Sequence, residues 1–153
     1  ILWKGDDMAR PKKLITKIKD ANYEHEVIIS PKPYILLLSA PFSDPEGRME
    51  KVLAEIAEEY EDVVKAGILN IMQERELTEM FEISTAPTLI LMTGGVVDIR
   101  LPGYPEKEEI IRVMELDKIR EYRQRGFNYH PPRNFVPGRE MESDEEENDG
   151  ESR

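Results

Sequence analysis

The sequence predicts an α/β domain in which a central mixed sheet of about five strands is flanked by about four helices. Short apolar runs alternate with amphipathic segments along the chain, and the last two apolar runs are joined by a glycine pair. The resulting order is strand, helix, strand, helix, strand, helix, hairpin, helix. Alternation of this kind builds layers of helices against a sheet.

Five segments have strand patterns. Residues 13–19 alternate between apolar and polar side chains. Residues 34–39 form a continuous apolar run, which is typical of a strand covered on both faces. The remaining strands are expected at residues 67–72, 88–92 and 96–101. Gly94-Gly95 between the last two predicts a two-residue hairpin turn.

Four segments are expected to be helical. Residues 20–28 read as a short helix with Asp20 as its N-cap. Residues 43–60 carry apolar side chains at three- and four-residue spacing, so one face is expected to be buried: Met49, Val52, Leu53, Ile56 and Tyr60. A short helix is expected at 74–81, and a last helix at 105–125, stopped by Gly126. Tyr23 is expected at the surface, and five methionines are expected to fill the core: Met49, Met72, Met80, Met92 and Met114.

The composition excludes several kinds of site. The chain has 153 residues, no cysteine and two histidines, so disulfides, thiolate catalysis and cysteine or histidine-rich metal sites are excluded. We expect no cofactor. The net charge of -11 is uneven: residues 139–153 hold eight acids and two bases, whereas residues 117–138 hold five bases and two acids. The acidity is therefore largely a property of the tail, and a basic collar precedes it.

No targeting segment is visible. The longest purely apolar run is residues 34–38, far short of the roughly 20 residues that cross a membrane. We therefore expect a soluble, cytoplasmic protein without membrane insertion. Met8-Ala9-Arg10 resembles a natural start, which leaves residues 1–7 open to three interpretations: a leader, a processed end or a cloning scar. Residues 1–11 are assigned to an N-terminal leader that precedes the domain.

Residues 12–116 resemble thioredoxin. Residues 53–60 are similar to the end of the helix that follows the thioredoxin active site, and residues 69–71 to the next strand. Ala86-Pro87-Thr88-Leu89 resembles the loop whose cis-proline faces that site. Gly95 and Gly103 fall where thioredoxins keep glycines. The resemblance implies the thioredoxin fold and a cis bond before Pro87.

The same register places the family's Trp-Cys-Gly-Pro-Cys motif on five residues that contain no thiol: Phe42, Ser43, Asp44, Pro45 and Glu46. The family's buried aspartate falls on Leu37, and the lysine that pairs with it falls on Ile68. The resemblance therefore implies a redox-inactive member that is not an enzyme.

Ser43-Asp44-Pro45-Glu46 has the Ser-x-x-Glu spacing of a capping box. We expect Ser43 to accept a hydrogen bond from the N–H of Glu46, and the Glu46 side chain to return one to Ser43. A nucleophilic Ser43 is disfavoured because neither histidine lies near it in sequence. An acid–base pair of Asp44 and Glu46 is disfavoured because the two flank a proline at an exposed helix start.

The proline loop, Ala86-Pro87-Thr88, has two open interpretations. In thioredoxins the backbone before this proline pairs with an extended substrate peptide. A residual peptide groove could thus form between this loop, Phe42 and Tyr104. Alternatively, Pro87 merely shapes the loop.

The C-terminal part is absent from thioredoxins. Residues 117–126 are expected to extend the last helix, residues 127–139 to form an extended aromatic and proline-rich arm, and residues 140–153 an acidic disordered tail. Such an arm lies either on its own domain or on a partner, and we favour a partner. The candidate contacts are Tyr104, Arg123, Phe127, Tyr129, Pro131, Pro132, Arg133 and Phe135. The acidic context of Ser143 is a weak phosphorylation signal.

These features favour a protein–protein interaction or scaffolding subunit of a larger assembly, which contacts its protein partner through the arm or through the Pro87 face. One alternative is an assembly chaperone of the kind that serves hydrogenase maturation, since residues 88–103 are similar to that subgroup. Another is nucleic-acid binding by the collar at 118–133, which the net charge of -11 disfavours. The oligomeric state is left open.

Overall fold

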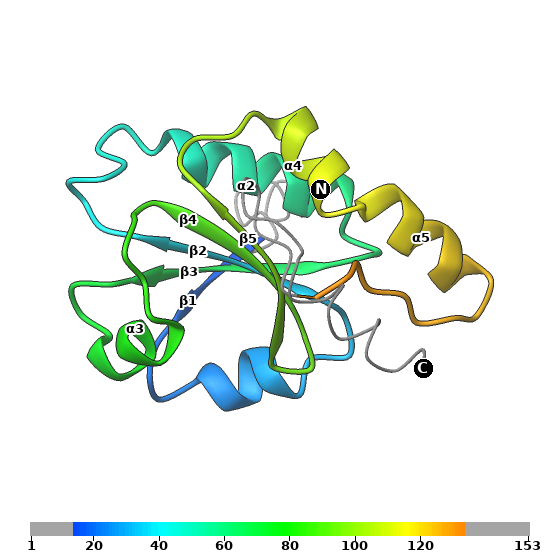
Figure 1. Ribbon diagram of the computed structural model, residues 1–153, viewed down its shortest axis with the longest axis horizontal. Helices are drawn as coiled ribbons and strands as arrows, with labels where there is room; N and C mark the ends of the chain where they lie inside the picture. The colour runs from blue at the N-terminus through cyan, green and yellow to red at the C-terminus, as the bar shows by residue number, and fades with distance from the viewer. Residues whose placement is uncertain (1–13, 134–153) are drawn as a thin grey trace, which may run out of the picture.

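The computed structural model describes residues 14–133 and contains one five-stranded mixed sheet (Figure 1). The strands are β1 (Ile15–Ile18), β2 (Tyr34–Ser39), β3 (Lys65–Asn70), β4 (Thr88–Thr93) and β5 (Val96–Pro102), and they lie in the order β1-β3-β2-β4-β5. β3 is parallel to β1 and β2, whereas β4 is antiparallel to β2 and β5. The predicted α/β thioredoxin fold is confirmed.

Helices cover both faces of this sheet. α2 (Arg48–Glu59), α4 (Lys107–Val113) and α5 (Leu116–Gln124) contribute to the core on one face. η1 (Glu24–Ile28) and α3 (Arg75–Phe81) contribute to the core on the other (Figure 1). The sheet is therefore the middle of three layers.

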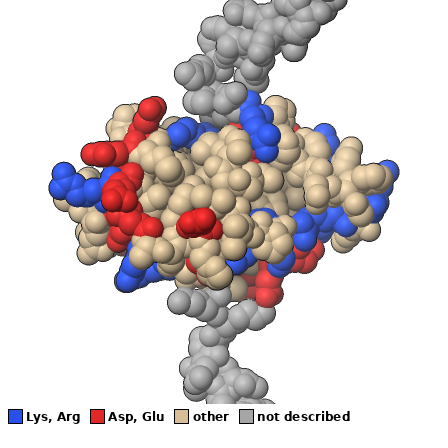
Figure 2. All heavy atoms as spheres, turned by 90° about the horizontal axis from the view of Figure 1, so that it is seen from below, with Lys and Arg blue, Asp and Glu red and all other residues tan. Residues whose placement is uncertain are grey.

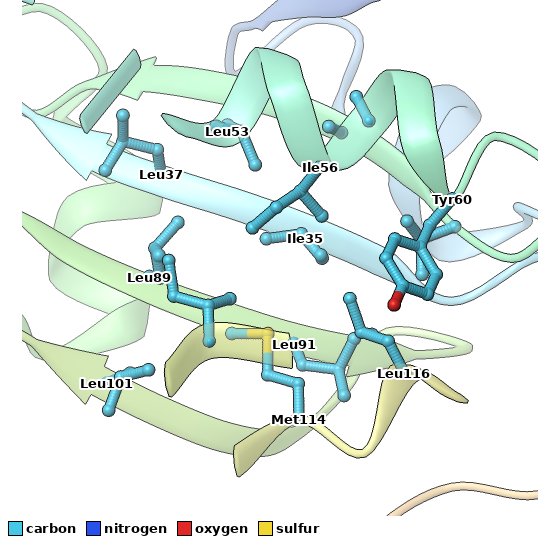
Figure 3. Packing of buried hydrophobic residues seen from close by; sticks show 14 of the residues in the cluster. Ile35, Leu37, Leu53, Ile56, Tyr60, Leu89, Leu91, Leu101, Met114 and Leu116 are labelled. Carbon is cyan, nitrogen blue, oxygen red and sulfur yellow. The ribbon is translucent and has the colours of Figure 1, made fainter. Parts of the chain in front are cut away.

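The larger core lies between the sheet and α2. Figure 3 shows Leu53 and Ile56 of α2 over Ile35 of β2, and the cluster continues into β4, β5 and α5. The amphipathic pattern predicted for this helix is thus confirmed. All six residues of β2 are buried, as its continuous apolar run predicts.

The second core holds the even-numbered residues of β2 against η1 and α3. Tyr23 is buried there, with its ring edge-on to Phe81 at 5.9 Å between centroids. The expected surface position of Tyr23 is wrong, because a short first helix on a sheet face must bury one side of itself. Asp20 does not cap its own segment, since its carboxylate accepts a hydrogen bond from the N–H of Leu77 in α3 at 3.2 Å.

The last predicted helix is two helices. Glu115 adopts a left-handed conformation with φ of 53°, which ends α4 and starts α5 at Leu116. The break re-aims the chain so that Leu116 and Ile119 reach the core, where both are buried. Residues 117–124 are therefore part of a separate helix and do not extend α4. Gly126, with φ of 88°, follows the end of α5 as expected.

The β4–β5 hairpin turns at Gly94 and Gly95, whose φ angles of 59° and 85° confirm the predicted glycine turn. A β-bulge between Leu91 and Met92 leaves Asp98 as the extra residue of β5. Asp98 is completely buried. A bulge re-aims a side chain, and here it directs a carboxylate toward the segment that follows α5.

The segment after α5 folds back on its own domain. The Tyr129 ring lies 5.0 Å from the Tyr122 ring, and the Nζ of Lys118 lies 4.8 Å from the Tyr129 ring centroid. The Tyr129 hydroxyl donates a hydrogen bond to the Glu115 carboxylate. Pro131 is buried.

Arg133 completes this contact at Asp98. Its Nε donates to Oδ1 of Asp98 at 2.7 Å, while Oγ1 of Thr93 donates to Oδ2 at 2.6 Å. Nδ1 of His130 lies 3.7 Å from the same carboxylate. We call the contacts of Tyr129, Pro131 and Arg133 with the domain the C-terminal clasp.

α5 is also tied to the end of α2. The Tyr60 hydroxyl donates to Asp117 at 2.7 Å, and the Arg120 guanidinium lies 4.4 Å from the Tyr60 ring centroid. Arg120 forms two hydrogen bonds with the Asp62 carboxylate, at 2.9 and 3.0 Å. Burial, and then the hydrogen bond with Asp117, raise the pKa of Tyr60 to about 12.

The clasp predicts a stability effect. Replacing Arg133 with methionine keeps its apolar stem but leaves the buried Asp98 carboxylate without its charged partner. We expect the free energy of unfolding, measured by urea denaturation at neutral pH, to fall by about 1.5–3 kcal/mol. Arg123→Met on α5 is the control and should change it by less than about 0.5 kcal/mol. Equal losses in the two variants would contradict the clasp.

Tyr60 predicts a loss of stability in alkali. Its pKa is about 12 in the folded protein, against 10.0 for an ordinary tyrosine. Because the folded pKa is the higher one, the contribution is complete below pH 10 and is lost as the pH rises through 12. Urea denaturation at about pH 9 and about pH 11 should show a steeper loss in the parent than in Tyr60→Phe. Parallel losses would argue against a perturbed Tyr60.

Candidate functional site

Four loops meet at one edge of the sheet. β2, β3 and β5 end there, and β4 begins there because it runs antiparallel to β2 and β5. The loops are residues 40–47, 71–74, 82–87 and 103–106. The edge lies on the left of Figure 1, at the α3 end of the molecule. It holds every residue that the sequence analysis placed in the former active-site motif and the proline loop.

Ser43 is a structural residue of the first loop. Its side chain is buried, and Oγ accepts from the N–H of Ala40 at 3.0 Å and donates to the Ala40 carbonyl at 2.9 Å. Oγ of Ser39 lies 3.4 Å away. No base is among these contacts in the described part of the chain, so the geometry offers no route to an activated hydroxyl.

The predicted capping box does not form. α2 begins at Arg48, after Gly47 in a left-handed conformation with φ of 68°, so Ser43 and Glu46 lie outside the helix. Asp44 caps it instead: Oδ2 accepts from the N–H of Met49 at 3.1 Å and from that of Glu50 at 3.3 Å. Gly47 moves the helix start, and the carboxylate one residue beyond Ser43 reaches the free N–H groups.

The proline loop and the loop after β5 lie beside each other, and the loop after β5 contacts residues 40–47. The Ala86–Pro87 peptide bond is cis, as the resemblance implies. Pro87 is buried, and its carbonyl accepts from the N–H of Gly103 at 2.9 Å. The Tyr104 hydroxyl donates to the Ser43 carbonyl, and the Arg48 guanidinium lies 5.9 Å from the Tyr104 ring centroid. Thr88 is buried and bonds back to the Thr85 carbonyl at 2.5 Å.

Three large apolar side chains remain exposed at this edge: Phe42 at 69%, Met72 at 62% and Tyr104 at 47%. We call Phe42, Met72 and Tyr104 the edge surface. Met72 lies outside the core because Oδ1 of Asn70 accepts from its N–H at 2.8 Å, in a turn that ends β3. The core position expected for Met72 is therefore wrong, as is that of Met80, whereas Met49, Met92 and Met114 are buried.

A polar cleft of about 420 Å³ opens beside the edge surface, where β1, β2 and β3 end. Its charged lining is mixed, with two lysines and three carboxylates: Lys17, Lys19, Asp44, Glu50 and Glu74. No local sequence pattern predicts this cleft, since its walls come from segments far apart in the chain. A mixed lining does not select a ligand of one charge.

The arm and the collar are largely engaged within the domain. Tyr129, Pro131 and Arg133 form the clasp, while Phe127 is 58% exposed, Pro132 is exposed and Arg123 is half-buried. Their predicted contact with a partner stays a prediction, and Phe135 lies outside the described residues.

In the collar, Arg120 is bound to Asp62 and Arg125 to Glu121 at 3.5 Å. Hydrogen bonding to the Tyr129 hydroxyl is the largest of the interactions that raise the pKa of Lys118. Within residues 14–133, no group of three or more histidine, aspartate and glutamate side chains could hold a metal ion. No helix in the same range is long and apolar enough to span a bilayer.

Because Asp44 caps α2, the two neighbouring carboxylates Asp44 and Glu46 should contribute differently to the free energy of unfolding. Asp44→Ala removes the acceptor for two N–H groups of α2, so we expect the free energy of unfolding to fall by about 0.5–2 kcal/mol. Glu46→Ala, two residues away, should change it by less than about 0.5 kcal/mol. A capping box would reverse that order. Thermal or urea denaturation of both variants decides between the two arrangements.

Comparison with known proteins agrees with this geometry. The thioredoxin family model matches residues 14–116. Thioredoxin of Alicyclobacillus acidocaldarius is 37% identical over 93 residues, which cover 61% of this chain and 88% of that protein. Thioredoxin of Haemophilus influenzae is 31% identical over 83 residues, which cover 54% of this chain and 78% of that protein. Thioredoxin of Pyropia yezoensis is 30% identical over 81 residues, which cover 53% of this chain and 76% of that protein. The chain belongs to the thioredoxin family, and it carries no cysteine with which to perform dithiol chemistry.

Proposed function

We propose that this chain is a redox-inert interaction module that binds a segment of a partner protein across the edge surface. The observation that carries the proposal is the state of the former active-site loop. Hydrogen bonds of Ser43 and Asp44 hold the loop together, and the same loop leaves Phe42 largely exposed to solvent. The loop is held in place by hydrogen bonds and carries no thiol for redox chemistry.

The exposure of the edge surface favours binding. Single exposed apolar side chains are ordinary, but apolar side chains on adjacent loops of one edge are typical of interaction sites. Large aromatic side chains contribute disproportionately to binding energy. Phe42 and Tyr104 supply two of them, on loops that follow β2 and β5.

The rigidity of the edge reduces the entropic cost of binding. Tyr104 is held by its bond to the Ser43 carbonyl, and Pro87 by its bond to Gly103. Asp44 fixes the end of the first loop on α2. A preorganised surface loses little conformational freedom when a partner docks. An extended segment lying across these loops is the binding mode that the geometry supports best.

Two alternative functions are an assembly chaperone and a nucleic-acid-binding protein, and the geometry favours the first over the second. An assembly chaperone would use the same surface transiently, so it differs in the lifetime of the complex and not in the site. Nucleic-acid binding by the collar loses support, because Arg120 and Arg125 are paired with carboxylates of this domain. We therefore propose the interaction module, with permanent scaffolding and transient chaperoning as its two forms.

A photo-crosslinking amino acid tests the site. It is placed at position 42 in one variant and at position 29 in another, because Phe42 and Ile29 have similar exposures of 69% and 62%. Expression of the full chain in its native host should give one discrete crosslinked protein from position 42. Position 29, on the η1 side of the sheet, should give none.

Two controls complete the design. Tyr104→Ser should weaken the crosslink from position 42, whereas Val96→Ser should leave it unchanged, since the exposed Val96 lies at the β4–β5 hairpin, at the opposite end of these strands. Equal crosslinking from positions 42 and 29, or none from position 42, would contradict the proposal. The lifetime of the crosslinkable complex, followed by pulse and chase, separates scaffold from chaperone.

A further inference from the structure

We infer that the segment bound by the edge surface is basic as well as apolar: a stretch of lysine or arginine interleaved with aliphatic side chains. This inference rests on the proposed function, because it names the chemistry of the partner at the same surface. It is carried by the charges that surround Phe42, Met72 and Tyr104, which the proposed function does not use.

The loops of the edge, with α3, are strongly acidic. Residues 40–47, 71–87 and 103–106 contain seven carboxylates and one cation, Arg75. The carboxylates are Asp44, Glu46, Glu74, Glu76, Glu79, Glu82 and Glu106. Figure 2 shows acidic side chains gathered at the left end of the molecule, the end that holds α3 in Figure 1.

Most of these carboxylates are free to interact with a partner. Asp44 caps α2, and Glu74 accepts a hydrogen bond from the N–H of Asp20 at 2.9 Å. The other five are exposed and have no hydrogen bond or ion pair with any residue in 14–133: Glu46, Glu76, Glu79, Glu82 and Glu106. A carboxylate without an internal partner keeps its full attraction for an approaching cation.

Nearby cations offset only part of this negative charge. Against the seven carboxylates stand Arg75 of α3, Arg48 over the Tyr104 ring, and Lys17 and Lys19 on the β1 side of the cleft. A second group of cations, Lys118, Arg120, Arg123 and Arg125, lies on and directly after α5, which is on the right of Figure 1, at the opposite end of the domain. A basic segment is therefore drawn toward the edge surface and an acidic one is repelled from it, which sets both the encounter rate and the specificity.

The apolar part of the edge suits aliphatic side chains. Met72 and Met80 are exposed at 62% and 54% on either side of the Glu74–Glu79 stretch. Methionine is unbranched and polarisable, so it adapts to aliphatic partners of different shape. Long lysine and arginine stems can lie along such a surface while their charged ends reach the carboxylates.

The test uses two short synthetic peptides and the full chain. One peptide alternates leucine and lysine residues to form an amphipathic segment, and its twin has glutamate in place of every lysine. Binding is measured by fluorescence anisotropy. Two double variants carry the same change in net charge: Glu46→Lys with Glu79→Lys at the edge, and Glu24→Lys with Glu58→Lys on η1 and α2 as the matched control.

We expect the lysine peptide to bind the parent, and to bind the edge variant at least about tenfold more weakly. The control variant should lose less than about threefold, because screening limits charge effects beyond roughly 8 Å at physiological salt. Phe42→Ser should weaken binding as well, whereas Ile29→Ser should not.

The contradicting outcomes distinguish between a wrong partner chemistry and a wrong binding site. Equal losses in the two double variants would show attraction by net charge alone and would overturn this inference. Equal binding of the glutamate twin, still weakened by Phe42→Ser, would overturn the basic partner and leave the edge surface as a binding site. Absence of binding by both peptides, together with a discrete crosslink from position 42, would also overturn the basic partner alone. Absence of both would overturn the proposed function too.

Discussion

The burial of β2 on both faces is the constraint on which the rest of this structure depends. A strand whose six residues are all buried must lie in the middle of the sheet and be covered by helices on both sides. β3 pairs with it in parallel and β4 in antiparallel orientation, so the chain leaves β2 at the edge where it also leaves β3 and enters β4. The loop with Phe42 and Ser43, the loop with Pro87 and the loop with Tyr104 come together for this reason. The position of the site follows from packing and not from chemistry.

The same packing accounts for the side chains that the resemblance matches to the thioredoxin redox centre. That resemblance places the family's buried aspartate on Leu37, which is completely buried in the main core (Figure 3). The resemblance matches the paired lysine to Ile68, which packs against the same cluster. By that match, apolar core side chains stand where thioredoxins hold a proton-handling pair. The same match places the two thiols on Ser43, which is buried and bonded to backbone, and on Glu46, which is exposed. The loop is held by neutral and charged hydrogen bonds, and its exposed aromatic residue is what remains available to other molecules.

The sequence predicts the sheet, the glycine hairpin and the cis-proline, because each of these depends on a local pattern or on matched family residues. Prediction from the sequence fails where the conformation of a residue depends on a contact with a residue far away in the chain. Asp98 and Arg133 are 35 residues apart, and nothing near Asp98 in sequence marks it as the anchor of the C-terminal clasp. The Ser43–Glu46 spacing predicts a capping box, but Gly47 in a left-handed conformation delays α2 and gives the cap to Asp44. The break at Glu115 arises because Leu116 and Ile119 have to reach the core. Met72 is apolar in the sequence, yet a turn at Asn70 places it outside the sheet.

Hydrogen exchange measured on the full chain, free and in complex with the protein crosslinked from position 42, tests most directly whether the former active-site edge is now a binding surface. Binding across the edge surface should slow amide exchange in residues 40–47, 82–86 and 103–106 on complex formation. Exchange in residues 127–133 should not change, because the clasp already holds them on the domain. Slowed exchange confined to residues 127–133 would contradict binding at this edge and would make the arm the binding element.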